Sequence, residues 1–504
     1  MVTVSSADGS PDVELDSRRG RLLLTTVVLG TTVASLTATV VNVALPTLAS
    51  DLDASSSGQK WIVNAYTLTL ASFILVGGSL GDRFGRVRLY RIGVVWFAVA
   101  SLLCAIAPTV ELLIVCRLLQ GIGGALLTPG SLAIIESSLR SDDRGRGVGA
   151  WSGITGIAGA IGPLVGGLLV EISWRWVFVI NIPVAIAVIV LSRWLPETRD
   201  RSARDASIDV TGAVATAVLL AGLSYALIEG PEGGLSGVEI AAVVAAGMAA
   251  AVLWVVERRI AHPMVPIELF ANRVFGVANG LTFAIYGGMG VLFFLLPIQL
   301  QVTAGWSALE AGAALIPVTL LMLVLSPRMG DLSGRIGPRL PLTFGPIATA
   351  LGIVLMIRVG PDASFATDVL PAVIVFGLGL SGIVAPVTST ALGSVPDERA
   401  GAASGVNNAV ARTGGLLAVA AIPGLAGLTG DALSDPTRLG DGFDTAMWIS
   451  AAIVAAAGVA AFALLRPDDV AAEVAGEDVD DGRPCCHACP VDGQLSSVSR
   501  SSDH

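Results

Sequence analysis

The sequence predicts an all-helical integral membrane protein with fourteen transmembrane helices. The first observation is composition, since 53% of the 504 residues are hydrophobic and 14% are charged, against roughly 25% charged residues in a soluble domain. The second is the recurrence of apolar runs of about 20 residues, the length that crosses a hydrocarbon core of about 30 Å. The third is the lack of the period-two alternation expected of barrel strands. A mean hydropathy of +0.77 agrees with this fold class.

Charged residues lie between the apolar runs and indicate where the predicted helices begin and end. The spans lie near 22–48, 59–80, 88–107, 110–138, 147–171, 175–195, 209–228, 236–256, 273–301, 308–329, 340–358, 366–392, 401–423 and 444–465. The seventh and eighth are separated only by the short connector GPEGGLSG. An even count puts both termini on one side of the membrane.

Arginine is distributed unevenly between alternate loops, which predicts the orientation. With the amino terminus in the cytoplasm, most arginines fall in cytoplasmic loops, whereas the outer loops hold only Lys60, Arg175, Arg358 and Arg438. The expected location is therefore a bacterial cell membrane, with both termini cytoplasmic.

The two terminal tails contain no motif that predicts a catalytic or metal-binding site. Residues 1–20 are polar and acidic, unlike a signal peptide, and residues 467–504 are acidic and serine-rich, as in a disordered tail. The tail residues Cys485, Cys486, His487 and Cys489 are too crowded for the usual paired spacing of zinc ligands, so no metal site is expected.

A short hinge between the second and third spans, GSLGDRFGRVRLYR at 78–91, combines one acid with four arginines. A similar segment, GDLSGRIGPR at 330–339, follows the tenth span. Their alignment pairs Gly78 with Gly330, Arg83 with Arg335 and Gly85 with Gly337. This repetition predicts two related halves, as in many secondary transporters.

Several motifs in order along the chain resemble the major facilitator superfamily, and specifically its fourteen-helix drug:proton antiporter branch. They are VNVALP at 41–46, the hinge at 78–86, RLLQGIGGA at 117–125, the glycine-rich run 153–167 and WRWVFVINIP at 174–183. The resemblance implies a cytoplasmic tail (1–20), a six-helix bundle (21–208), two inserted helices with their loop (209–272), a second six-helix bundle (273–466) and a disordered tail (467–504).

In that family the hinge acts as a gate latch at the cytoplasmic face, with Asp82, Arg83, Gly85 and Arg86 in the matching positions. A carboxylate at a helix end can accept charge-assisted hydrogen bonds from arginine. The alternative is that these arginines only fix topology.

Arg117 lies within the fourth span, where a charge is expensive and should face a partner or a cavity. Gln120 follows at i+3 on the same helix face. The resemblance implies that Arg117 and Gln120 take part in proton coupling. The alternative is a structural hydrogen bond to a neighbouring backbone carbonyl.

The fifth span carries glycines every three or four residues together with a proline, at Gly159, Gly162, Pro163 and Gly166. Such a face permits close helix packing, and packing alone would explain it. In the family this pattern accompanies exporters, which is the main argument for the direction of transport.

One departure from the family concerns the first span, where relatives carry an aspartate and this chain has Thr37. No Asp or Glu falls in the central third of any predicted span, although a buried acid is the usual proton carrier and counter-charge for cationic drugs. The sequence therefore favours neutral, zwitterionic or weakly charged substrates over dicationic ones.

The substrate cavity is expected to be lined by a mixture of apolar and polar side chains. The candidates by position are Thr37, Asn42, Trp61, Asn64 and Tyr66 in the first half, and Tyr286, Gln299, Asn407 and Arg412 in the second.

The predicted function is proton-coupled efflux of hydrophobic drugs or antibiotics by a monomer in the lipid bilayer. The sequence has no GxxxxGK[ST] nucleotide loop, so the proton gradient should supply the energy, with no cofactor, no enzymatic reaction and no nucleic-acid partner. A facilitator-type importer or uniporter of a small metabolite is the alternative. A non-transporting sensor is disfavoured, since the short tails provide no folded cytoplasmic domain.

Overall fold

The fold is helical throughout the part of the chain that a computed structural model describes, residues 13–198, 209–234, 236–260, 266–396 and 399–466. Extended pairing there is limited to an isolated bridge between Val13 and Leu139. The all-helical prediction is therefore confirmed. The predicted tail 467–504, with its cysteines and His487, lies outside the described residues, as does most of the tail 1–20.

The first half of the chain forms seven helices. They are α1 (Arg18–Leu52), α2 (Ser56–Phe84), α3 (Arg86–Ala105), α4 (Val110–Ser138), α5 (Ser141–Val170), α6 (Trp176–Val179) and α7 (Asn181–Ser192). Hydroxyl side chains begin three of them, since Ser17, Ser55 and Thr109 each accept a hydrogen bond from a first-turn N–H. Such caps satisfy amide groups that a helix cannot satisfy itself.

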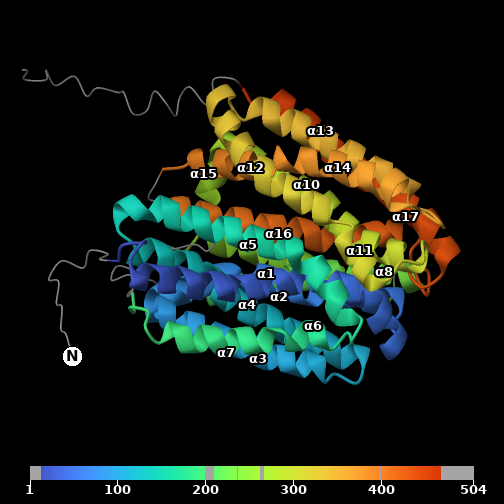
Figure 1. Cartoon of the computed structure of the whole chain (residues 1–504), viewed down its shortest axis with the longest axis horizontal. Helices are drawn as coiled ribbons and strands as arrows, with labels where there is room; N and C mark the ends of the chain where they lie inside the picture. Colours follow the sequence, from blue (N-terminus) through green and yellow to red (C-terminus); the bar gives the residue numbers. More distant parts are fainter. Residues whose placement is uncertain (1–12, 199–208, 235, 261–265, 397–398, 467–504) are drawn as a thin grey trace, which may run out of the picture.

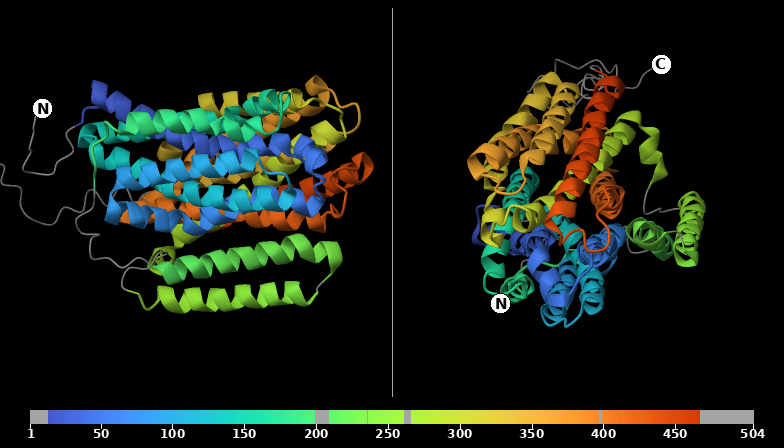
Figure 2. Two further views of the ribbon diagram at one scale, coloured as in Figure 1. Left: turned by 90° about the horizontal axis from the view of Figure 1, so that it is seen from below. Right: turned by 90° about the vertical axis from the view of Figure 1, so that its right-hand side faces the viewer.

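The middle of the chain forms a hairpin of α8 (Val210–Gly233) and α9 (Gly237–Glu257). It lies along one side of the remaining helices (Figure 2). Asp209 caps α8 and Ser236 caps α9. The connector expected between the seventh and eighth spans is mostly helical, because α8 continues through Pro231 to Gly233.

The second half begins with a short 3₁₀ helix, η2 (Ile267–Ala271). It continues with α10 (Arg273–Val302), α11 (Ala308–Ala313), α12 (Ile316–Ile336), α13 (Arg339–Leu355), η3 (Met356–Arg358), η4 (Phe365–Val369), α14 (Leu370–Ser381), α15 (Val384–Gly393), α16 (Ala400–Leu425) and α17 (Pro436–Leu464).

Twelve helices in the described residues are long and apolar enough to cross a membrane. Two further apolar segments, Ile161–Val170 and Trp176–Ser192, are shorter and fall where the fifth and sixth spans are predicted. The chain is thus a multi-pass membrane protein, whereas the count of fourteen spans stays a prediction.

The two halves repeat one packing pattern (Figure 1). In the first half α1 packs on α5, α2 on α4 and α3 on α7, and in the second α10 packs on α16, α12 on α14 and α13 on α17. The halves meet where α2 contacts α16 and where α5 contacts α11 and α12. The second helix of each half therefore faces the fifth helix of the other.

The hinges that the sequence aligned share one backbone geometry. Gly85 separates α2 from α3 with φ of 111°, and Gly337 follows α12 with φ of 84°. Side chains rarely tolerate this left-handed region, so glycine permits these sharp helix-to-helix turns. The predicted correspondence of Gly85 with Gly337 is confirmed at the level of the backbone.

The two ends of the molecule differ in how the halves touch. We call the end at which α2 joins α3 the arginine-rich end, and the end at which α1 joins α2 the opposite end. Four hydrogen bonds join the halves toward or at the opposite end, namely Asn42 Nδ2 to Phe293 O (3.1 Å), Gln301 Nε2 to Val43 O (3.0 Å), Ser56 N to Gly430 O (2.9 Å) and Leu433 N to Ser56 Oγ (3.2 Å). These four hydrogen bonds latch the halves together toward the opposite end. Nearer the arginine-rich end α16 packs on α2, where a Cβ on Gly405 would lie 2.7 Å from Leu75 Cδ2.

Candidate functional site

Arg117 is buried inside the first half, with 1% of its surface exposed. Its Nε donates to the backbone carbonyl of Ile62 in α2 at 3.0 Å, and Nη1 donates to Gln120 Oε1 at 2.6 Å. The guanidinium also lies 4.5 Å from the ring centroid of Tyr66, within the range of a cation–π interaction. The structure thus contains the carbonyl contact expected of a structural arginine and the Gln120 contact on the same helix face.

A chain of hydrogen bonds continues from Arg117 across three more helices. Gln120 Nε2 donates to Ser101 Oγ in α3 at 2.7 Å, and Asn181 Nδ2 in α7 donates to the same oxygen at 3.2 Å. Thr37 Oγ1 in α1 donates to Asn181 Oδ1 at 3.1 Å. Each of these side chains is at most 1% exposed. Thr37, the departure from the family motif, is therefore linked to Arg117 through three buried polar groups.

This polar chain holds a cation without a carboxylate. Among the described residues, no Asp or Glu lies within ion-pair distance of Arg117. A buried charge is normally paired, and here the ring of Tyr66, the Gln120 amide and the Ile62 carbonyl stabilise it instead. The chain can orient groups and relay hydrogen-bond changes between α1 and α4, but it has no acid to carry a proton. Sequence reasoning missed Ser101 and Asn181.

The predicted cavity residues do not gather into one cluster. Tyr66 donates to Ala34 O at 3.2 Å within the first half, and Asn407 donates to Asn279 and Thr282 within the second, both at 3.1 Å. Trp61 lies near the opposite end beside Tyr225 of α8. Three buried polar atoms on the predicted or adjoining faces lack hydrogen-bond partners within the described structure, namely Asn42 Oδ1, Asn64 Nδ2 and Arg412 Nε.

The glycines of α5 bring this helix against both halves. A Cβ added at Gly162 would lie 2.0 Å from Thr39 Oγ1 of α1, and one at Gly166 would lie 3.0 Å from Val40 O. Thr39 Oγ1 itself donates to Gly159 O at 3.1 Å. On the other side, Pro163 O would lie 2.1 Å from a Cβ at Gly312 of α11. Gly162, Gly166 and Gly312 therefore sit where a side chain would clash, and the contact of Gly312 with Pro163 O joins the halves.

The hinge residues form an ion pair within the first half. Arg86 donates to Asp82 Oδ1 from both Nε and Nη2 at 2.8 Å, and its Nη1 donates to Ala133 O of α4 at 3.2 Å. The guanidinium of Arg83 lies 5.5 Å from the centroid of the Phe84 ring. The hydrogen bonds and the ion pair that the described structure gives Asp82 lie within the first half.

Sequence reasoning also missed a carboxylate that caps α3. Glu197 Oε1 accepts hydrogen bonds from the amides of Val87 (3.0 Å) and Arg88 (3.4 Å), and Thr198 O accepts from Arg86 N at 3.1 Å. An acid is favourable at a helix amino terminus. The segment that leaves α7 toward the inserted hairpin is thereby fixed to the hinge.

The inserted hairpin fastens both halves at the opposite end through a group we call the α8 clasp, made of Glu229 and Glu232. Glu232 accepts from Lys60 Nζ in α2 at 3.3 Å and from Gly430 N in the second half at 2.6 Å. Glu229 accepts from Trp61 Nε1 at 2.7 Å and Ser57 Oγ at 2.5 Å. Lys60, expected in an outer loop, is instead in the first turns of α2, and its side chain is 0% exposed.

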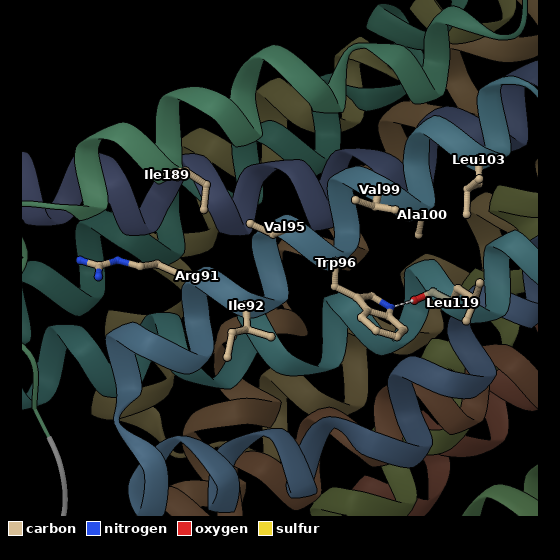
Figure 3. A pocket seen from close by; sticks show the side chains of 9 residues that line it. All are labelled: Arg91, Ile92, Val95, Trp96, Val99, Ala100, Leu103, Leu119 and Ile189. Carbon is tan, nitrogen blue, oxygen red and sulfur yellow. Dashed lines mark hydrogen bonds between the residues drawn. The ribbon is translucent and has the colours of Figure 1, made fainter.

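Two surface hollows lie away from this buried chemistry. One of about 520 Å³ is lined by α3, α4 and α7 side chains (Figure 3), where Trp96 Nε1 donates to Leu119 O at 2.7 Å. Its exposed apolar side chains, such as Val95 and Val99, suit contact with lipid. The second, of about 770 Å³, lies at the opposite end between the halves, beside the pair of Asp51 with Arg175 at 3.0 Å.

Comparisons with known proteins agree with this arrangement. The Major Facilitator Superfamily matches residues 27–419. The puromycin resistance protein pur8 of Streptomyces alboniger is 34% identical over 394 residues, which cover 76% of this chain and 77% of that protein. The tetracenomycin C resistance and export protein of Streptomyces glaucescens is 32% identical over 419 residues, covering 82% and 77%.

Solved structures share the fold. A crystal structure of the peptide transporter POT in complex with sulfate superposes with a TM-score of 0.64 at 17% sequence identity, and the match covers 92% of this chain and 100% of that one. At that identity the likeness concerns the fold alone.

Proposed function

The chain belongs to the major facilitator superfamily, and on that premise we propose that it exports hydrophobic drugs or antibiotics in exchange for protons by alternating access. Relatives named for puromycin resistance and for tetracenomycin C resistance and export support the substrate class. We further propose fourteen spans, arranged as two six-helix bundles with α8 and α9 inserted, in a bacterial cell membrane with both termini cytoplasmic.

The observation that carries this proposal is the way α5 joins the two halves. Its glycines contact α1 in the first half and its Pro163 carbonyl contacts Gly312 in the second. Such contacts, together with the hydrogen bonds of Gln301 and Ser56 between the halves, hold the opposite end closed. In this proposal the substrate enters from the arginine-rich side, the side proposed as cytoplasmic.

The Asp82–Arg86 pair is the proposed latch for the other state. When the arginine-rich end closes, this pair becomes available to the second half, where the glycine turn at Gly337 after α12 repeats that at Gly85. The buried chain from Arg117 to Thr37 is the proposed route by which a proton bound elsewhere in the protein alters the packing of α1 on α4.

Proton movement in inside-out vesicles tests the proposal. Vesicles containing the protein are acidified inside, and tetracenomycin C or another hydrophobic antibiotic without a basic amine is added while internal pH is recorded. Alkalinisation with the wild type that is lost in Arg117→Ala supports antiport. Accumulation of the antibiotic without proton movement refutes proton coupling and supports the facilitator alternative.

A further inference from the structure

Arg412 is a cation in the middle of α16. Its Nε is buried, and no hydrogen bond or ion pair to the residue occurs among the described residues. The rest of the residue is partly exposed. A buried donor without an acceptor is costly, so this position calls for an acceptor that arrives from outside the protein.

The position of Arg412 is between the two halves. One helical turn later, Leu416 is buried with Leu68 and Ala71 of α2 and with Leu220 of α8. Since residues four apart share a helix face, Arg412 lies on the face of α16 that meets the first half. It is within electrostatic range of the hydroxyls of Tyr66 in α2 and Tyr286 in α10.

Tyr66 therefore has an arginine from each half near it. Arg117 contacts its ring and is fully buried, whereas Arg412 approaches from the second half. The flanking helices α2, α10 and α16 carry acids only at Asp82, at an end of α2. The acids of α8, Glu229 and Glu232, are engaged in the clasp. In the described structure the centre thus holds two positive charges and no negative one.

We infer that the central site binds organic anions: hydrophobic molecules bearing one acidic group, which accepts hydrogen bonds from Arg412 while the apolar body contacts the half-buried ring of Tyr286. This inference rests on the proposed efflux function and names its substrate class. An arginine offers several donors in a fixed fork that suits oxyanions. The anion would neutralise the positive charge of Arg412, which no described carboxylate pairs with.

The membrane potential favours the same direction of transport. In a cell whose interior is negative, moving a monoanion outward yields about a fifty-fold gradient per 100 mV, from the work of moving one charge. An exporter of anions therefore needs no carboxylate in its spans to use this energy. That matches a chain in which no Asp or Glu falls in the central third of any predicted span.

Binding to the intact protein in lipid nanodiscs tests the inference with three probes of similar size. They are naphthalene-1-sulfonate, a permanent anion, neutral 1-naphthylmethanol, and naphthylmethyl-trimethylammonium, a permanent cation. The wild type should bind the sulfonate most tightly. Arg412→Gln should raise the Kd of the sulfonate about 10- to 100-fold, the loss expected for a hydrogen bond to a charged group, and leave the alcohol within about twofold.

Matched variants separate this role from general damage. Arg412→Lys keeps the charge and should retain part of the sulfonate affinity, and Arg328→Gln removes an exposed arginine of α12 that donates to Val324 O and should change nothing. Equal sulfonate binding by wild type and Arg412→Gln overturns the inference, as does a wild type that prefers the cation. If the antibiotic assay shows transport while the sulfonate does not bind, the anion inference fails and the efflux proposal stands.

Discussion

Replacing Glu232 with glutamine should open the end of the molecule that the structure holds closed. Glu232 is a side chain of the inserted hairpin that accepts hydrogen bonds from both halves, from Lys60 and from the amide of Gly430. Glutamine has nearly the same size and can still accept one hydrogen bond. The substitution therefore removes the charge and little else.

The magnitude follows from the burial of Lys60. A hydrogen bond to a charged group contributes roughly 1.5–3 kcal/mol, and the Lys60 side chain is 0% exposed while that of Glu232 is 19% exposed, so water does not replace the lost partner. Glu229 also interacts with Lys60 and offsets part of the loss. We expect the ratio of open to closed forms to rise about tenfold, the lower end of that range.

Cysteine labelling measures this ratio. Ala432 is 0% exposed next to Leu433, whose amide bonds to Ser56, so Ala432→Cys reports opening when the three tail cysteines are replaced by serine. A membrane-impermeant maleimide should label the Glu232→Gln variant about ten times faster. Glu239→Gln in α9, which touches Ser236 within the hairpin, is the matched control. Labelling of Glu232→Gln at the wild-type rate would show that the clasp does not hold this end closed.

Three further predictions concern the other contacts. Gly162→Leu should lower the thermal unfolding temperature by several degrees. The new Cβ would lie 2.0 Å from Thr39 Oγ1, and overpacking costs about 1–3 kcal/mol. Gly159→Ala, where the nearest neighbour of the new Cβ is at 3.9 Å, is the control in the same melting assay. Gln120→Leu should leave Arg117 Nη1 without its acceptor and cut substrate-induced proton movement in vesicles severalfold, an idea that unchanged proton movement would contradict. Asp82→Asn should slow transport severalfold with substrate affinity unchanged, and a change in affinity alone would argue against a latch.

Much of the fold could be predicted because a helix that crosses a bilayer needs about 20 consecutive apolar residues, which are visible in the sequence. Apolar runs locate the spans. The positive φ of Gly85 and Gly337 explains why both hinges have glycine at the aligned positions. Gly162 could also be predicted as a packing residue, since only a residue without a side chain permits the approach of α1 seen there.

The remaining parts depend on contacts between residues far apart in the chain. Ser101 and Asn181 are single polar residues in apolar runs, and nothing local shows that they meet between Gln120 and Thr37. Lys60 is the only lysine of the chain, a signal that could have marked it for a specific partner. Its pairing with Glu232, 172 residues away, requires the hairpin to be placed first.

The absence of an acid from the central parts of the spans and the presence of Arg117 and Arg412 there both favour an anionic substrate. A cationic substrate in the centre would add a third positive charge near Tyr66, where the described residues offer no carboxylate, and burial makes such repulsion strong. An anion there pairs with Arg412 and leaves Arg117 in its own hydrogen-bond chain. The negative charge that the described centre lacks would then enter with each substrate and leave with it. Thr37 can serve in such a transporter as a hydrogen-bond donor to Asn181, without having to exchange a proton.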